Sequence, residues 1–369
     1  MEPRVRLPIA EVTGDDPAAL PTLQARWVRA LLDGAEVPRE TGATCDDCAM
    51  LPPPGETPTQ GHWFNAATRC CTYVPELANF LVGAVLEDHE NPDGIGTVRA
   101  RMASGAAVTP MGILQGEDFL SRYDGSPETF GRSEALLCPH FDDGRCTVWR
   151  HRESTCATWF CKHTRGAVSK AFWNRLHQLL RAAERHLARH CAVELGIPPA
   201  GIAMMHPMIS VDGTLRGHDV VPVGSLTERG AYERLWGPWA GREEAFYRAA
   251  YRVVEPMSWD DVVVAAGSEV KALSTVVRLA LARTRDESIA ERVALGSLQV
   301  VGMSAGSVRV QGYSFLDPLD VPRVLFDVLH HFDGRPLAEA ISLATAAAGE
   351  PVPEGAIRML IDFGVLRAV

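Results

Sequence analysis

The chain has 369 residues, of which 46% are hydrophobic and 22% are charged, and its formal net charge is −10. This length leaves room for two or three units with cores of their own, and the composition is typical of a soluble globular protein. The acidic balance disfavours broad binding to nucleic acid, which needs a basic surface, and no apolar run approaches the roughly 20 residues that span a bilayer.

The N-terminal third of the chain predicts helices separated by long loops. Its first 20 residues contain no long apolar stretch that would serve as an export signal, so we expect a cytoplasmic protein in a reducing compartment. A helix is predicted over 20–32, and the proline- and glycine-rich stretch 41–61 predicts a loop. A second helix is predicted over 75–88. The weakly patterned segment 89–137 is interpreted as strands and loops.

Two longer helices are predicted in the middle of the chain. The first spans about 168–195 and has a continuous apolar face that includes Cys191, which we interpret as a packed core residue. The second begins with the capping-box sequence Ser258-Trp259-Asp260-Asp261 and is expected to reach Ala282.

The residues from 298 onwards predict a winged-helix-like unit. Alternating apolar residues over 298–313 predict a β-hairpin, so Gly302–Gly306, which spells the nucleophile-elbow pattern GxSxG, is interpreted as its turn. Three helices, over 321–332, 337–348 and 353–363, and a closing strand at 365–367 follow. The pattern resembles the peptide-binding domains of peptide-modifying enzymes, which implies a peptide or protein partner. The alternative is a structural appendage, and sparse basic residues disfavour DNA binding.

Eight of the nine cysteines fall into two groups along the chain. Clustered thiols in a reducing compartment are typical of metal ligands rather than of disulfides. We therefore predict that all eight ligate metal: Cys45, Cys48, Cys70, Cys71, Cys138, Cys146, Cys156 and Cys161.

The spacing of the upstream cysteines suits metal binding. The two residues between Cys45 and Cys48 allow both sulfurs to reach one metal ion. Cys70 and Cys71 stand just before a predicted helix, whose N-terminal end favours anionic sulfur.

The downstream cysteines need turns to bring them together. Between Cys138 and Cys146 the sequence Asp142-Asp143-Gly144-Arg145 predicts a hairpin that brings these two sulfurs close. Cys156 and Cys161 are five residues apart, so a bend in the chain is needed for them to converge.

The residues leave the identity of the metal open. Eight sulfurs could form two closed zinc sites of four thiolates each, or could ligate one or two iron–sulfur clusters such as [4Fe–4S]. Four histidines lie near enough in sequence to replace a cysteine, although each could instead be solvated or hydrogen-bonded: His62, His140, His151 and His163.

The order of the cysteines resembles that of the bacterial cysteine-cluster proteins described as zinc- or iron-chelating domains. The matching residues are Cys45, Cys48, Cys70-Cys71, Cys138-Pro139, Cys146, Cys156 and Cys161, within 41–165. The same domain type occurs in flagellin lysine-N-methylases, so the resemblance implies S-adenosylmethionine and an iron–sulfur cluster. The chain departs from the family pattern in having 21 residues between Cys48 and Cys70, where the family is usually tighter.

Together these patterns predict an α+β, mainly α-helical protein with a cysteine-ligated metal domain plus a winged-helix-like C-terminal unit. The expected divisions are an N-terminal helical segment (1–40), a metal-binding domain with a long helix (41–200), a helical middle region (201–297) and the C-terminal unit (298–369). The expected function is that of an iron–sulfur protein taking part in modification of a peptide or protein. The alternative is a non-enzymatic, zinc-stabilised protein- or peptide-binding module, so these patterns leave open whether the chain is an enzyme.

Overall fold

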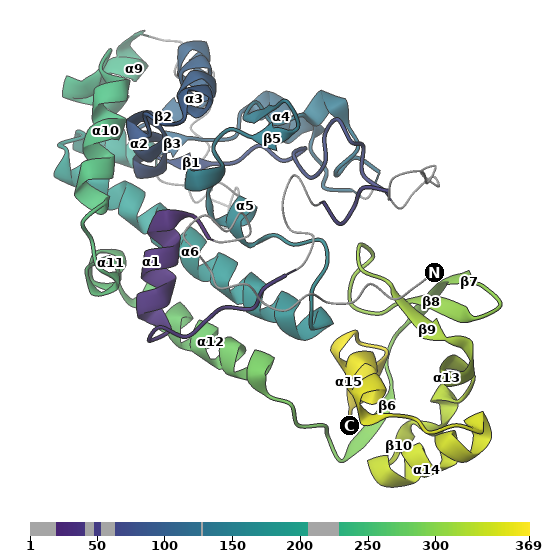
Figure 1. Ribbon diagram of the computed structural model, residues 1–369. Coiled ribbons are helices and arrows are strands. Elements are labelled where there is room, and N and C mark those ends of the chain that lie inside the picture. The colour runs from purple at the N-terminus through teal and green to yellow at the C-terminus, as the bar shows by residue number, and fades with distance from the viewer. Residues whose placement is uncertain (1–19, 41–47, 53–62, 127, 206–228) are drawn as a thin grey trace, which may run out of the picture.

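The computed structural model describes residues 20–40, 48–52, 63–126, 128–205 and 229–369. Within them the protein is an α+β structure that is mainly helical, as the sequence predicts. A helical part precedes a smaller unit of strands and helices, which lies at the opposite end of the molecule from α9 (Arg229–Trp236) and α10 (Glu243–Val254) (Figure 1). No helix in the described ranges is both long and apolar enough to cross a membrane.

The helical part also contains several very short strands. Its remaining elements are α1 (Thr22–Leu31), β1 (Leu77–Ala78), α2 (Asn79–Glu87), α3 (Pro92–Ser104), β2 (Val108–Thr109), β3 (Gly112–Ile113), α4 (Glu117–Arg122), η1 (Glu134–Leu136), β4 (Phe141–Asp142), β5 (Arg145–Cys146), η2 (Trp149–His151), α5 (Ser154–Thr158), α6 (Gly166–Glu194), α7 (Pro199–Met204), η3 (Gly237–Trp239), α11 (Trp259–Ala266) and α12 (Ser268–Arg285).

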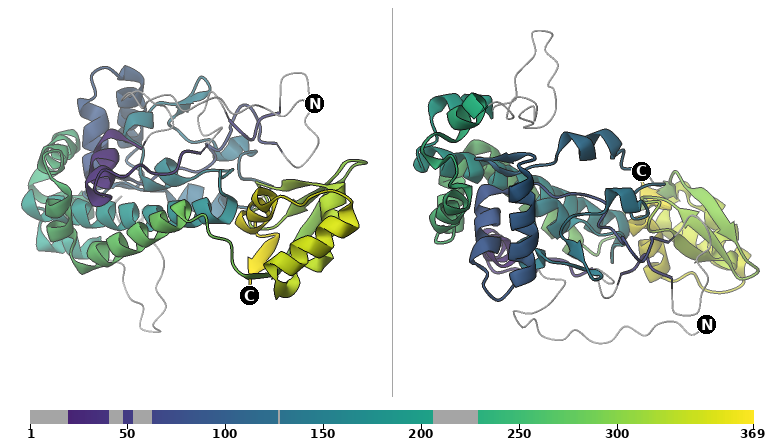
Figure 2. Two further views of the ribbon diagram at one scale, coloured as in Figure 1. Left: turned by 60° about the horizontal axis from the view of Figure 1, so that its bottom comes forward. Right: turned by 90° about the horizontal axis from the view of Figure 1, so that it is seen from above.

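The core of the helical part is organised around α6, which realises the long helix predicted over 168–195. Helix α12 runs beside α6, and α5 and α11 pack against it as well (Figure 2). Residues from the predicted divisions 1–40, 41–200 and 201–297 all contribute to this one core. The buried face of α6 carries the apolar residues that its periodicity predicts, including Phe172, Leu176, Leu179, Leu180, Ala183, Leu187 and Cys191.

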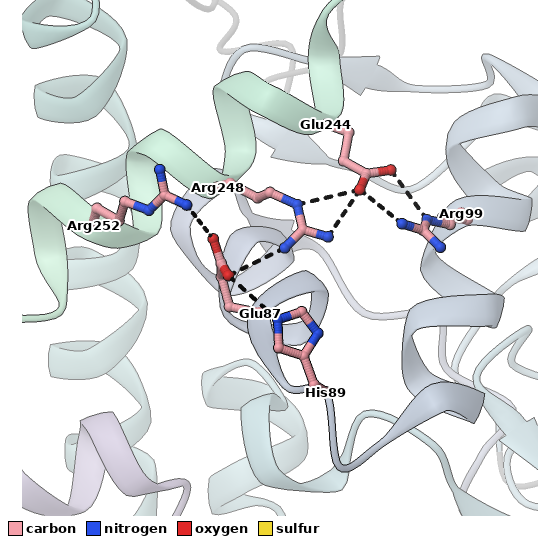
Figure 3. A network of polar contacts seen from close by, with 6 residues as sticks. All are labelled: Glu87, His89, Arg99, Glu244, Arg248 and Arg252. Atoms are coloured by element: carbon pink, nitrogen blue, oxygen red, sulfur yellow. Dashed lines mark hydrogen bonds and ion pairs between the residues drawn. The ribbon is translucent and has the colours of Figure 1, made fainter.

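Helices α2 and α10 cross at very close range and are tied together by charged side chains. Glu87 of α2 pairs with Arg248 at 3.2 Å and with Arg252 at 2.8 Å, both from α10. Glu244 extends the network by pairing with Arg248 and with Arg99 of α3, each at 2.9 Å (Figure 3). The hydrogen bond from Arg99 is the main reason that the pKa of Glu244 is lowered to about 2. Because these groups are partly exposed, each pair adds little by itself, and the network mainly fixes the register of the three helices.

The C-terminal unit contains two three-stranded antiparallel sheets, with strand orders β10-β6-β11 and β7-β8-β9. Its own core is centred on Val293, Val310, Phe332 and Leu360. The elements are β6 (Arg292–Leu295), β7 (Gln299–Met303), β8 (Ser307–Gln311), β9 (Leu319–Pro322), α13 (Arg323–Asp327), η4 (Leu329–His331), β10 (Asp333–Pro336), α14 (Leu337–Ala348), α15 (Glu354–Asp362) and β11 (Leu366–Ala368).

A partly buried ion pair attaches this unit to the start of α6. The guanidinium of Arg165 forms two hydrogen bonds with the carboxylate of Asp362, at 2.9 and 3.0 Å. The same guanidinium donates to the carbonyl of Thr284 at 2.8 Å, at the end of α12. This bidentate geometry is the strong form of an ion pair, and it joins the last helix of the chain to both long helices of the core.

Several predicted elements are confirmed. The hairpin β7–β8 closes through a hydrogen bond from the Ser304 N–H to the Ser307 carbonyl at 2.8 Å, so the GxSxG sequence is a hairpin turn. Helix α14 spans the predicted 337–348, and α1 lies within the predicted 20–32. The capping box at Ser258 is present as well.

Other predictions are wrong about where helices begin, end or break. The segment 89–137, interpreted as strands and loops, contains the 13-residue helix α3, which Asn91 caps by accepting from the N–H of Gly94. The helix predicted from Pro75 begins only at Asn79. The segment 321–332 is divided among β9, α13 and η4, and a break at Gly267 separates α11 from α12. Glycine-rich helices and local breaks have weak sequence signals, because their formation depends on contacts with distant residues.

Candidate metal centre

Backbone contacts bring together cysteines that are far apart in sequence. The N–H of Cys138 donates to the carbonyl of Cys71 at 2.8 Å, and the N–H of Cys71 donates to Thr68 at 3.0 Å. The side chain of Arg69 donates to the carbonyl of Gly144, in the turn that precedes Cys146. The Cys70-Cys71 segment is therefore fastened both to Cys138 and to the hairpin that follows it.

The predicted hairpin between Cys138 and Cys146 is present as β4–β5. Its register pairs Phe141 with Cys146. Asp143 and Gly144 both have positive φ, at 43° and 77°, as the tight two-residue hairpin turn requires. The turn sequence thus placed Cys146 correctly beside the segment that starts at Cys138.

Cys156 reaches the same region from the short helix α5. Glu153 precedes this helix and caps it, accepting from the N–H of Cys156 at 3.0 Å and from the N–H of Thr155. A carboxylate at a helix N-terminus is a stabilising cap. Here it also places a negative charge beside the sulfur of Cys156.

The five cysteines of these three segments interact electrostatically, and we refer to them as the thiol set: Cys70, Cys71, Cys138, Cys146 and Cys156. The pKa of Cys71 is raised first by its hydrogen bond with Cys70, then by burial and by the charges of Cys70, Cys138 and Cys146. Burial is the main cause of the raised pKa of Cys156, followed by Glu153 and by the charges of Cys146, Cys138 and Cys70. Without a cation, most of these sulfurs would stay protonated.

The remaining described cysteines near this region lie against the C-terminal unit. Cys48 and Cys161 pack at the edge of a small apolar group formed by Met50, Phe64, Phe130 and Leu316. Burial raises the pKa of Cys161, and the charges of Cys70 and Cys48 raise it further. Leu316 belongs to the loop that follows β8, so this pair of cysteines stands where the helical part meets the C-terminal unit.

Two predicted candidates, Cys45 and His62, lie outside the described residues. Cys191 is a core residue of α6, as predicted, and its thiol lies 3.7 Å from the carbonyl of Ala250.

The thiol set has the type of donor atom that zinc and iron–sulfur clusters select, but its side chains are not arranged as a metal site. Among the described residues, no three His, Cys, Asp or Glu side chains stand in an arrangement that would hold a metal ion as they are. Soft, negatively charged sulfur is nevertheless the donor type that zinc and iron–sulfur clusters select. Binding would have to draw the thiol side chains together and release their protons.

The histidines differ in whether their ring nitrogens have partners. The Nε2 atom of His151 lies 3.0 Å from the carboxylate of Asp88, and the Nδ1 atom of His163 lies 3.3 Å from the hydroxyl of Tyr313. Both therefore match the hydrogen-bonded alternative considered above. His140 is fully buried, its Nδ1 atom lies 3.0 Å from the hydroxyl of Thr97, and burial lowers its pKa to about 3.

A pair of buried glutamates beside the thiol set has no sequence signal. Ser154 donates its hydroxyl toward Glu184 at 2.7 Å and also lies 3.3 Å from Glu153. Gln24 of α1 donates to Glu184 at 2.6 Å. Burial, and then the charge of Glu153, raise the pKa of Glu184 to about 8. Only the packing of α5 against α6 brings the two carboxyl groups together.

We expect Glu184 to contribute stability that is lost as the pH rises from about 5 to 8. Folded Glu184 retains a proton up to about pH 8, whereas its ordinary pKa is 4.5. Between these values the carboxyl group of Glu184 holds more protons in the folded state than in the unfolded state, so its contribution to the free energy of unfolding decreases by at most about 1.4 kcal/mol per pH unit. Glu184→Gln should flatten this slope in denaturant titrations at several pH values.

The matched control for this prediction is Glu269→Gln on α12. The pKa of Glu269 is lowered, mainly by its hydrogen bond with His186, so this carboxylate is already ionised in both states across the same pH range. Parallel pH profiles for the wild type and Glu184→Gln would contradict the assignment of the slope to Glu184.

Comparison of the chain with protein-family models, curated proteins and solved structures found no match.

Proposed function

We propose that this chain is a metal-thiolate protein, carrying an iron–sulfur cluster, that takes part in the modification of a peptide or protein. The single observation that supports the metal most strongly is that the backbone joins Cys71 to Cys138, at the start of the hairpin that carries Cys146, so that cysteines from separate stretches of the chain lie in one region. Cys70 is exposed and the other four thiols are buried or half-buried, and a cation would hold such a group together. When bound, an iron–sulfur cluster supplies electron transfer or an open iron position.

The C-terminal unit is proposed as a winged-helix-like, peptide-binding element. A pocket of about 670 Å³ opens between the β6–β7 connection and the α13–η4 segment, lined by Leu295, Leu298, Phe326, Asp327, Leu329 and His330. The adjoining strand β7 is an edge of its sheet. Val300 and Met303 of this strand are 42% and 63% exposed. An edge strand beside a pocket that takes alternate side chains is a common arrangement for binding an extended peptide.

A set of contacts connects this unit to the candidate metal centre. Asp317 accepts from the N–H of His163 at 3.0 Å, two residues after Cys161. Leu316 packs in the apolar group that borders Cys48 and Cys161. The unit proposed to bind the peptide therefore contacts the segment that carries Cys161 directly, and a peptide-modifying protein needs such a connection between its binding element and its reactive centre.

The resemblance of the cysteine pattern to the bacterial cysteine-cluster family adds two elements to the proposal. The family is described as zinc- or iron-chelating, and the flagellin lysine-N-methylases that share its domain type connect it to an iron–sulfur cluster and make S-adenosylmethionine a candidate co-substrate. The proposal places the protein in the cytoplasm, where cysteines remain reduced and available for metal.

A second candidate function is a zinc-stabilised binding module without catalysis. The observation that favours it is the burial of Cys138 and the half-burial of Cys71, Cys146 and Cys156. Closed four-thiolate zinc sites bury their sulfurs and leave no open position for a substrate. In that case the metal would stabilise the fold, and the C-terminal unit would carry the function.

The experiment that decides between these functions is analysis of metal and acid-labile sulfide, with a visible absorption spectrum, on anaerobically purified protein. Iron with sulfide and visible colour supports the first proposal. Colourless protein with bound zinc supports the second, because zinc has a filled d shell. Protein that binds neither metal and keeps its fold would overturn both.

A further inference from the structure

His140 is a fully buried imidazole that has a partner on one side of its ring. Its exposed fraction is 0%. The Nδ1 atom lies 3.0 Å from the hydroxyl oxygen of Thr97, whereas the Nε2 atom has no hydrogen-bond partner among the described residues. Buried polar atoms are nearly always paired, so an unpaired ring nitrogen calls for an explanation.

The hydrogen bonds around Thr97 indicate which nitrogen carries the proton. The hydroxyl of Thr97 lies 3.1 Å from the carbonyl of Gly94 and 3.0 Å from the hydroxyl of Thr147. The hydroxyl of Thr147 in turn donates to the carbonyl of His140 at 3.0 Å. If Nδ1–H donates to Thr97 and Thr97 donates to Gly94, every proton in this group has an acceptor.

The other tautomer satisfies fewer groups. It would place the ring proton on Nε2, as a buried donor without an acceptor among the described residues, at a cost of about 1–3 kcal/mol. It would also require Thr97 to direct its only proton to His140 instead of Gly94. The Nδ1–H tautomer is therefore favoured, and it leaves Nε2 with a bare lone pair. This is the state in which histidine ligates a metal, its other ring N–H being held by a protein oxygen.

His140 is connected to the thiol set through its backbone and through a shared charged neighbour. The backbone N–H of His140 hydrogen-bonds to the sulfur of Cys138. The guanidinium of Arg101 interacts electrostatically with both the sulfur of Cys138 and the ring of His140. The ring of His140 and the sulfur of Cys138 thus share Arg101 as a charged neighbour, at the start of the hairpin that carries Cys146.

We propose that His140, through Nε2, is a ligand of the metal bound by the thiol set, and that Thr97 fixes its orientation. The inference rests on the proposed function, since it requires that the thiol set binds metal. It makes the centre a mixed sulfur and nitrogen site rather than an all-cysteine one. In an iron–sulfur cluster, replacement of cysteine by histidine raises the reduction potential.

The test uses the full chain as purified, with its histidines labelled with ¹⁵N. For an iron–sulfur protein, pulsed electron paramagnetic resonance should detect hyperfine coupling from one ¹⁵N nucleus. For a zinc protein, long-range ¹H–¹⁵N correlation spectra should show one histidine with Nδ1–H and a metal-shifted Nε2. The signal should disappear in His140→Ala and remain in His151→Ala, the matched control, because the Nε2 atom of His151 already has Asp88 as its partner.

A second variant separates ligation from a packing role. Thr97→Val keeps the imidazole but removes the hydroxyl that orients it. Loss of such an outer partner typically weakens metal binding by about 10- to 100-fold, which competition with a chelator measures. An unchanged affinity would overturn the role of Thr97.

The outcomes also separate this inference from the proposed function. Bound metal with no nitrogen signal in the wild type would overturn ligation by His140 and leave the metal-thiolate proposal standing. A signal that persists in His140→Ala would do the same. A chain that binds no metal would overturn both. A wild-type spectrum without a nitrogen signal overturns the ligation by itself, whether or not His140→Ala folds. If His140→Ala does not fold, Thr97→Val, which keeps the imidazole, tests the assignment of a positive signal to His140.

Discussion

Cys146→Ser should lower bound metal and soluble yield together. Serine is nearly isosteric with cysteine, and Cys146 lies half-buried in β5, paired with Phe141. The substitution should therefore disturb packing little. The binding free energy of a structural metal in small sites is roughly 10 kcal/mol or more, and this energy contributes to folding. Losing one ligand of the thiol set should thus cost several kcal/mol and reduce the metal content per chain by at least about half.

Cys191→Ala is the control, because it removes a thiol that lies in the core of α6 and not in the thiol set. It should cost about 1–2 kcal/mol of packing and leave the metal content unchanged. Elemental analysis and the fraction of soluble protein, measured in parallel, provide the comparison. Metal content equal to that of the wild type in Cys146→Ser would remove Cys146 from the ligand set.

Gly83→Ala should be strongly destabilising because it would separate α2 from α10. A Cβ atom at position 83 would lie 2.0 Å from the carbonyl oxygen of Tyr247 and 2.8 Å from the Cβ of Tyr251. Backbone atoms cannot move aside cheaply, so the helices would have to shift apart within the core. Overpacking of this kind typically costs about 1–3 kcal/mol and occasionally more. Chemical denaturation should show a lower unfolding midpoint.

Gly96→Ala in α3 is the matched helix-glycine control. A Cβ atom at position 96 has no heavy atom within 4 Å in the described structure, and the position is exposed. Because alanine restricts the unfolded chain and favours helix, this variant should gain about 0.5–1 kcal/mol. If the two variants lost stability equally, the close approach of α2 and α10 would not be the cause.

The charged network at the α2–α10 crossing (Figure 3) follows from the same close approach. Without a side chain at Gly83, the two helix backbones come near enough for Arg248 and Arg252 to reach Glu87. The close packing at Gly83 therefore determines that Glu87 pairs with arginines of α10. The sequence does not reveal this pairing, because Glu87 and Arg248 belong to distant helices.

Features with a local cause could be predicted from the sequence. The turn Asp142–Arg145 carries its own positive-φ chemistry, so the hairpin that positions Cys146 was expected before any contact was known. The apolar periodicity of α6 extends over many turns and predicts both the helix and the core role of Cys191. The alternation around β7 and β8 likewise distinguishes a hairpin turn from a nucleophile elbow. The metal-binding role of the cysteines is still a prediction.

Features that depend on long-range packing could not be predicted. Helix α3 contains Gly94 and Gly96, which weaken its local pattern, and the surrounding contacts stabilise it. The raised pKa of Glu184 arises only because α5 and α6 bury it near Glu153.

By itself, the sequence determined the number and type of candidate sulfur ligands, the turns that carry them and the long helix of the core, since these depend on residues near one another in the chain. The tertiary structure decided which thiols interact, which histidine keeps an unpaired nitrogen, and how the C-terminal unit contacts the Cys161 segment through Asp317. Those features depend on burial and on contacts between distant residues, and neither is encoded in local sequence spacing.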